Sequence, residues 1–349
     1  MYACKQTFPS TKDFRHSGYV LHLASSGGAL IAAGKSSTNY LHIIEKATFQ
    51  LVTSLGGRDA HSDTICDVEA LDKFTAASCG RDGLVKIWDS RQPSREVWSC
   101  KAAHASKDAE VNALASSGDL LAVSSGSQAK IFDIRTKGLY HEYTELHSEA
   151  ITGMQFQSSR LLVTCSEDGM IAVADVYDLQ NEDEGQAPLV AMNTQGGLRG
   201  LRVFDNTIFA ISATESLSVW NLDGTPRSEF DTVEKIRSHP LLDIDGSMGY
   251  IIDIYDEPGV GYTVLAGSSR GDALLANISK PDLPVVASFR SEGGHTEVIR
   301  DAVRDEHGHI FTGGEDGKII QWTLCDISAT PSYSLGPSDI NRKNRPAPY

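Results

Sequence analysis

The chain has 349 residues, a hydrophobic content of 40% and a formal net charge of −15 at pH 7. The hydrophobic content is sufficient for a large core, while the pI of about 5.1 argues against a general nucleic-acid binder, which needs a basic surface. An acidic surface favours encounters with basic proteins, but the same charge can serve only to keep a large β-protein in solution.

Six cysteines lie at scattered positions, with no Cys-x-x-Cys pair and no His-rich metal-binding spacing: Cys4, Cys66, Cys79, Cys100, Cys165 and Cys325. This pattern predicts reduced, buried thiols in an intracellular protein of the cytoplasm, the nucleus or both, without a metal site. Residues 1–17 lack the apolar region of a secretory signal, and no run of 18 apolar residues could span a membrane.

One spacing recurs and organises the chain. His61 lies 21 residues before Asp82 (82 − 61), while Ser78 lies four residues before that Asp and Trp88 six residues after it. These offsets recur in two further sets: His147, Thr164 and Asp168; and His295, Thr312, Asp316 and Trp322. Self-similarity at about 40–45 residues that ends in Trp-Asp is typical of a WD40 β-propeller blade.

Positions equivalent to Trp88 can be followed along the chain at steps of 42 to 56 residues: Ile44, Trp88, Phe132, Ala174, Trp220, Ala276 and Trp322. They predict an all-β, seven-bladed WD40 propeller with four-stranded antiparallel blades, formed by residues 1–330 as a single domain. Ile44 and Ala276 fit least well, because their repeats lack both the turn Asp and the Trp. A closed ring needs no partner to bury its core, so we expect a monomer.

A propeller must close its ring, and pairing one terminus into the last blade removes an exposed sheet edge. Residues 2–8 alternate enough to predict the outer strand of the blade whose inner strands lie at 297–325. Residues 331–336 offer a competing closure from the other terminus. Residues 331–349 as a whole predict a short polar tail.

Two segments interrupt the strand rhythm. Residues 178–187 carry four acids and no base, which predicts either a solvated loop or a docking site for a basic segment. Residues 223–248, between the fifth and sixth blades, are punctuated by Pro and Asp and predict a long surface insertion.

The recurring polar residues predict a buried hydrogen-bond network. Asp82, in a tight turn, accepts bonds from backbone N–H groups and from His61, which bonds Ser78, whose hydroxyl reaches the indole of Trp88. Ser, His and Asp also compose a hydrolase triad. However, the set occurs three times, and neither a Gly-x-Ser-x-Gly elbow nor a phosphate-binding loop accompanies it. We therefore expect no enzyme activity and no cofactor.

A second motif, Trp-Asp-x-Arg, places Arg91 three residues after Trp88 and is echoed by Arg135 after Phe132. Both arginines should project from the same rim of neighbouring blades. The motif resembles the one by which WD-repeat substrate receptors attach to the adaptor of cullin-4 ubiquitin ligases. Alternatively, each arginine covers its own blade and pairs with a nearby acid.

Propellers commonly bind partners over the channel mouth and on the face that carries the loops between successive blades, which is an expectation from the fold class alone. Residues that enter these loops are therefore candidate contacts for a partner protein: Arg58, Asp59, Lys107, Asp108, Glu149 and Glu297.

Over roughly residues 15–325, the chain resembles the WD repeat-containing protein 89 family of small eukaryotic propellers. The resemblance rests on CGRDGLVKIWDSR at 79–91, on the acidic insertion before PLVAMNT, on the long segment after Trp220 and, most strongly, on residues 293–322. It implies the propeller fold and says little about mechanism. From the fold class and the charge, we expect a non-enzymatic interaction scaffold or adaptor that holds a basic client protein during complex assembly. The alternative is a substrate receptor of a cullin-4 ligase.

Overall fold

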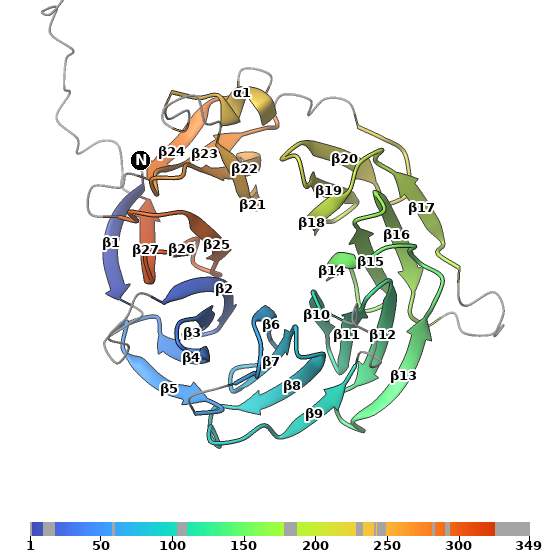
Figure 1. Cartoon of the computed structure of the whole chain (residues 1–349). Coiled ribbons are helices and arrows are strands. Elements are labelled where there is room, and N and C mark those ends of the chain that lie inside the picture. The colour runs from blue at the N-terminus through green and yellow to red at the C-terminus, as the bar shows by residue number, and fades with distance from the viewer. Residues whose placement is uncertain are drawn as a thin grey trace, which may run out of the picture.

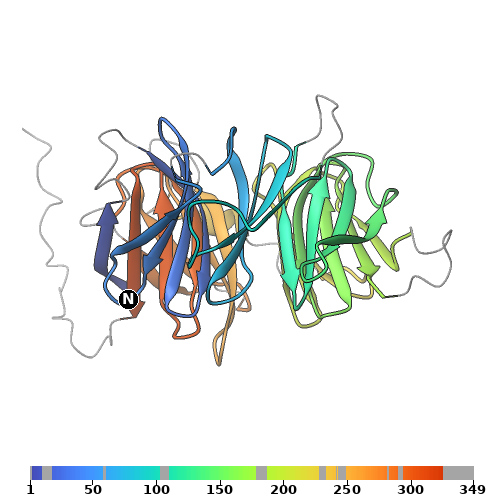
Figure 2. The same ribbon diagram turned by 90° about the horizontal axis from the view of Figure 1, so that it is seen from below.

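The structure, a computed structural model, describes residues 2–9, 18–57, 60–102, 110–177, 187–227, 233–240, 242, 249–280, 283–289 and 294–324. Side chains are described at all of these positions except 2–9, 233–234 and 323–324. Seven antiparallel sheets stand around a central axis as the blades of a propeller (Figure 1). They follow one another around the ring in chain order, and the edge-on view shows that each sheet spans the thickness of the ring (Figure 2).

The first four blades in chain order each contain four strands. Blade one holds β2 (Tyr19–Ser26), β3 (Ala29–Lys35), β4 (Asn39–Glu45) and β5 (Leu51–Leu55). Blade two holds β6 (Ile65–Ala70), β7 (Thr75–Gly80), β8 (Leu84–Asp89) and β9 (Trp98–Lys101). Blade three holds β10 (Leu114–Ser117), β11 (Leu120–Ser125), β12 (Gln128–Asp133) and β13 (Gly138–Tyr143). Blade four holds β14 (Ile151–Phe156), β15 (Leu161–Ser166), β16 (Met170–Asp175) and β17 (Val190–Asn193).

The last three blades include the ring closure. Blade five holds β18 (Leu198–Phe204), β19 (Thr207–Ser212) and β20 (Leu217–Asn221). Blade six holds β21 (Tyr250–Glu257), β22 (Gly261–Gly267), β23 (Ala273–Asn277) and β24 (Val285–Phe289). Blade seven holds β25 (Ile299–Arg304), β26 (Ile310–Gly314), β27 (Lys318–Leu324) and, as its outer strand, β1 (Tyr2–Pro9).

Strand pairing confirms the seven positions equivalent to Trp88. Each lies on the third strand of its blade and is paired with a residue of the second strand. The seven pairs are Ile44–Leu30, Trp88–Ala76, Phe132–Leu121, Ala174–Leu162, Trp220–Ile208, Ala276–Val264 and Trp322–Ile310. The predicted seven-bladed propeller is therefore confirmed, including its two weakest repeats.

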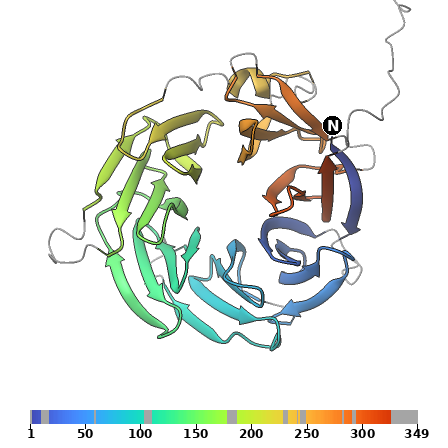
Figure 3. The same cartoon turned by 180° about the vertical axis from the view of Figure 1, so that it is seen from behind.

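The ring is closed by its N-terminal strand. β1 runs antiparallel to β27, from Tyr2 opposite Leu324 to Pro9 opposite Lys318. In the view from behind, β1 covers the outer side of the last blade, beside blade one (Figure 3). The closure predicted from residues 2–8 is thus confirmed. The competing segment 331–336, like the whole predicted tail, lies outside the described residues.

The core lies between blades rather than within them. Every residue of β11 and β19, the second strands of blades three and five, is buried. The apolar clusters join neighbouring blades: Leu55 of blade one packs with Trp88 of blade two, and Tyr143 of blade three packs with Ala174 of blade four. A blade covered on both faces needs continuous apolar strands, which explains why these segments do not alternate with polar residues.

Blade five differs from the others in the part of the chain that the structure describes. Its sheet has three strands, and a fourth pairing only begins where Pro226 bridges Trp220 and the Arg227 N–H donates to the carbonyl of Val219 at 2.7 Å.

The described part of the 223–248 insertion includes a short helix, α1 (Val233–Arg237). Ile236 and Leu242 are 3% and 1% exposed and belong to the core of blades five and six. The sequence predicted a surface insertion and did not anticipate these two core residues. Of the acidic insertion at 178–187, residues 178–186 lie outside the described residues.

Candidate functional site

The polar residues of blade two form one continuous hydrogen-bonded chain. The Trp88 indole N–H donates to Ser78 Oγ at 2.8 Å, Ser78 Oγ lies 2.7 Å from His61 Nε2, and His61 Nδ1 lies 3.0 Å from Asp82 Oδ1. Because the Ser78 oxygen accepts the indole proton, its own proton is free to donate to Nε2, so Nδ1 carries the ring proton and donates to Asp82. Asp82 also accepts the Leu84 N–H across the turn at Gly83, whose φ of 75° suits glycine.

The same chain recurs in blade seven, where Trp322 donates to Thr312 Oγ1 at 2.8 Å and His295 connects Thr312 to Asp316. In blade four, His147 Nε2 lies 2.8 Å from Thr164 Oγ1 and its Nδ1 lies 3.3 Å from Asp168. No indole completes the chain there, because Ala174 occupies the Trp position. The structure therefore brings together each set of residues that the sequence grouped.

The burial of these residues suits a structural role and not a catalytic one. Ser78 and His61 are both 0% exposed, and the Ser78 hydroxyl is held between the histidine and the indole. A nucleophile must reach its substrate, and a hydroxyl enclosed in this way cannot. The arrangement fixes the turn between the second and third strands and leaves its buried donors paired.

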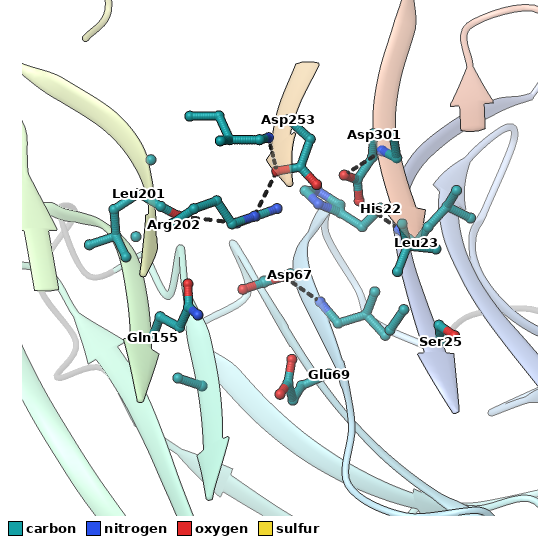
Figure 4. A pocket seen from close by; sticks show the side chains of 18 of the residues that line it. His22, Leu23, Ser25, Asp67, Glu69, Gln155, Leu201, Arg202, Asp253 and Asp301 are labelled. Carbon is teal, nitrogen blue, oxygen red and sulfur yellow. Dashed lines mark hydrogen bonds and ion pairs between the residues drawn. The ribbon is translucent and has the colours of Figure 1, made fainter. Parts of the chain in front are cut away.

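A central channel of about 940 Å³ runs through the ring, lined by the first strand of every blade. Figure 4 shows carboxyl groups from several blades projecting into it, with Arg202 of β18 directed at Asp253 of β21. Arg202 Nε lies 2.6 Å from Asp253 Oδ1. Other carboxyls that line the channel include Asp67 and Glu69 of β6 and Asp301 of β25.

Burial dominates the electrostatics of this channel. It raises the pKa of both Asp67 and Asp301 to about 7, and it also raises the pKa values of Glu69 and Asp253. For Asp253, the Arg202 guanidinium opposes the effect of burial without cancelling it. Burial lowers the pKa of the channel residue His22 to about 4.

The sequence analysis did not single out these channel acids. The signal that could have found them is Ile-x-Asp at the start of the first strand in blades two, six and seven: Ile65-x-Asp67, Ile251-x-Asp253 and Ile299-x-Asp301. Such a tripeptide is common, and only strand register shows that its carboxyl faces the ring axis.

Arg91 and Arg135 follow the third strands of blades two and three, so both lie at the same rim. Arg91 forms a bidentate pair with Asp89, with Nη2 at 2.7 Å from Oδ2, and its guanidinium lies 5.0 Å from the ring centroid of Phe74. Arg135 Nε lies 3.5 Å from Asp119 Oδ2. Their side chains remain 63% and 70% exposed. Each arginine thus pairs with an acid of its own blade while staying accessible.

Two of the loop candidates can be placed. Glu149 and Glu297 are exposed in the segments just before the first strands of blades four and seven. Exposed Glu167 lies at the same rim, because the turn between the second and third strands is on the side where the first strand starts. None of the three forms a salt bridge within the described residues. Arg58, Asp59, Lys107 and Asp108 lie outside those residues.

Across the described ranges, no group of three or more His, Cys, Asp or Glu side chains is placed to hold a metal ion. Over the same ranges, no helix has the length and apolar character needed to cross a membrane. Cys66, Cys79, Cys100 and Cys165 are free thiols, and burial raises the pKa of each.

Comparisons with known proteins agree with this architecture. The WD40 family model, described as "WD domain, G-beta repeat", matches residues 50–89. The WD repeat-containing protein 89 homolog of Dictyostelium discoideum is 28% identical over 349 residues, covering 95% of this chain and 92% of that protein. The GATOR2 complex protein Wdr59 of Drosophila melanogaster is 30% identical over 120 residues, which are 33% of this chain and 12% of that protein. The chain is therefore a WD40-repeat β-propeller protein that resembles the WD repeat-containing protein 89 family.

Proposed function

We propose that the chain is a non-enzymatic interaction scaffold, in the cytoplasm or nucleus, that holds a basic client protein during complex assembly. The observation that carries this proposal is the rim with the inter-blade loops, where Glu149, Glu167 and Glu297 are exposed and form no salt bridge within the described residues. Unpaired surface carboxylates on a chain of net charge −15 attract a basic surface at long range.

Further support comes from the relatives and from the recurring network. The name of the Drosophila relative places that protein in a complex, and WD-repeat propellers commonly serve as interaction platforms. The sets of Ser or Thr with His and Asp are largely buried and recur in three blades, which suits a rigid platform better than an active site. The free thiols of the described residues agree with a reducing compartment.

The test is recovery of bound proteins from cells at low and moderate salt, using the tagged chain and a Glu149→Gln, Glu167→Gln, Glu297→Gln triple variant. We expect a basic protein that is released as salt rises and that the triple variant fails to recover. A control with the same change in charge neutralises three acids on turns of the opposite rim, Asp119→Asn, Asp205→Asn and Glu306→Gln, of which Asp119 and Glu306 form salt bridges with Arg135 and Lys46. An acidic client, or binding that is indifferent to both salt and the triple variant, would contradict the proposal.

A second candidate is a substrate receptor of a cullin-4 ubiquitin ligase. It is favoured by the exposure of Arg91 and Arg135 on the same rim of adjacent blades. The pairing of each arginine with Asp89 or Asp119 favours the simpler view that they cover their own blades. An Arg91→Ala, Arg135→Ala double variant should lose the ligase adaptor if this candidate is right, and adaptor binding that survives the double change would exclude it.

A further inference from the structure

The first strand of six blades contains an irregular step at the same place. The register shifts between residues 20 and 22, 65 and 67, 151 and 153, 198 and 200, 251 and 253, and 299 and 301. Such an irregularity re-aims the side chain that follows it. The residues that follow are His22, Asp67, Gly153, Gly200, Asp253 and Asp301. The four that are not glycine project their side chains into the channel (Figure 4).

Two of these carboxyls join neighbouring blades. Asp67 Oδ2 accepts the backbone N–H of Leu114 in blade three at 2.8 Å. Asp301 Oδ2 accepts the N–H of Leu23 at 2.7 Å, across the boundary between blades seven and one. The other oxygen of each carboxyl accepts the N–H of the next residue of its own strand, at 2.8 Å in both cases. Each carboxyl therefore fastens two inner strands together, and Asp301 does so where the ring closes.

Asp67 and Asp301 have fewer cationic than acidic side chains around them. Of Asp67, Asp253 and Asp301, only Asp253 forms a salt bridge within the described residues, and its partner is Arg202. The titratable and charged groups that face Asp67 and Asp301 from the surrounding strands are His22, Cys66, Glu69, Cys79, Arg202, Asp253 and Tyr255. Burial raises the pKa of Asp67 and Asp301 to about 7, with Glu69 adding to the effect at Asp67 and Asp253 at Asp301, while the backbone N–H donors and Arg202 oppose it without cancelling it. Burial keeps His22 neutral above about pH 4.

We propose that Asp67 and Asp301 are proton-sensitive clamps between neighbouring blades, which make the closed ring more stable when they take up protons. A protonated carboxyl keeps an oxygen that accepts the N–H of the next blade and loses the charge that repels its neighbours. The folded chain then binds protons that an unfolded Asp, with its pKa near 3.9, would not bind. By linkage, these two aspartates add stability as the pH falls from about 7 towards about 4, while His22, whose folded pKa is about 4, acts in the opposite direction below its unfolded value of about 6.5. This device is independent of any client.

The test compares melting temperatures at about pH 8 and about pH 5.5 for the wild type, Asp67→Asn, Asp301→Asn and the double variant. Asn removes the charge and keeps one of the two oxygens that accept backbone N–H groups, so each variant loses one of these hydrogen bonds at both pH values. We expect the wild type to melt several degrees higher at the acidic pH. Each variant should therefore show a smaller difference in melting temperature between the two pH values than the wild type, and the double variant should lose most of that difference. Asp119→Asn, an exposed rim acid, is the control and should keep the wild-type difference.

Carbon-13 NMR titration of the aspartate carboxyls in the wild-type chain gives a readout that needs no variant to fold. Two carboxyl resonances should titrate near pH 7, and the Asn variants, where they fold, assign them. The proposal is overturned if all aspartate resonances titrate near their ordinary pH, if the wild type melts no lower at about pH 8, or if the double variant keeps the full difference.

Discussion

Blades two and four fill the same position in different ways. In blade two, Trp88 is 1% exposed and packs against Leu55 from the outer strand of the preceding blade. In blade four, Ala174 is small, and Tyr143 from the outer strand of blade three occupies the same cluster, with its hydroxyl donating to the Asp175 carbonyl at 2.9 Å. The contrast suggests that what must be maintained is the packed volume across the blade boundary, which either blade can supply.

Blade five separates packing from hydrogen bonding. Trp220 is equivalent to Trp88, but Ala210 stands where Ser78 would be, ten residues earlier. The buried indole nitrogen of Trp220 has no hydrogen-bond partner within the described part of the chain. The indole is therefore retained for its packing even where its polar partner is missing, and the two contributions can be measured apart.

The largest effect is expected from Trp88→Ala. Removing a fully buried indole leaves a cavity between blades one and two, which should lower the free energy of unfolding by about 3–5 kcal/mol. Trp220→Ala should cost clearly less, because Trp220 is only half-buried and its nitrogen is unpaired. Urea denaturation of both variants measures the difference. Equal losses would mean that the two indoles contribute alike.

A smaller loss is expected from Ser78→Ala, which leaves both the Trp88 indole and His61 without their partner. Each stranded group should cost roughly 1–3 kcal/mol. Thr164→Val in blade four strands only His147, so its loss of unfolding free energy should be about half as large. If Ser78→Ala proved stable but abolished a hydrolytic activity, the structural role assigned to this network would be wrong.

The loss of stability at acidic pH should depend on the carboxylates of the hydrogen-bond network. Burial alone would raise the pKa values of Asp82, Asp168 and Asp316, but the paired histidines and backbone N–H groups outweigh it and lower them. A lowered folded pKa gives stability that is present above the unfolded value of about 3.9 and is lost as the pH falls through the folded value. Asp82→Asn should therefore flatten the loss of melting temperature below about pH 4 and reduce stability at neutral pH. An acid limb as steep as that of the wild type would argue against this role.

The smallest effect is expected from restoring the missing partner in blade five. Ala210→Ser places a hydroxyl where it can accept the Trp220 indole N–H, which should raise the free energy of unfolding by up to about 1 kcal/mol. Ala210→Cys adds a similar volume with a poor acceptor and serves as the control. Chemical denaturation that gave equal values for both variants would show that volume, and not the hydrogen bond, decides this position.

The spacing of residues predicted the fold well because three repeats carry the offsets around their turn Asp, and steps of 42 to 56 residues from Trp88 then placed the remaining third strands, even at Ile44 and Ala276. What it missed depends on contacts between repeats. Tyr143 reads as an ordinary outer-strand residue until packing sets it beside Ala174. The sequence does not distinguish Asp301 from other acidic residues, and only the register shift in its strand directs its carboxyl into the channel. Ile236 and Leu242 lie in a segment of polar character, and only their tertiary contacts identify them as core.

The pairing of β1 with β27 also determines how long the ring must stay open during synthesis. Tyr2 and its partner Leu324 are 322 residues apart (324 − 2), which at ribosomal rates of about 5–20 residues per second means roughly 15 to 65 s between their appearance. Throughout that interval β1 has no native strand beside it, and blade one has no seventh blade against which to pack. Contacts this distant in sequence also form slowly once both ends exist. The nascent chain therefore has an unpaired strand for longer than most small domains do, and unpaired strand edges are prone to aggregation.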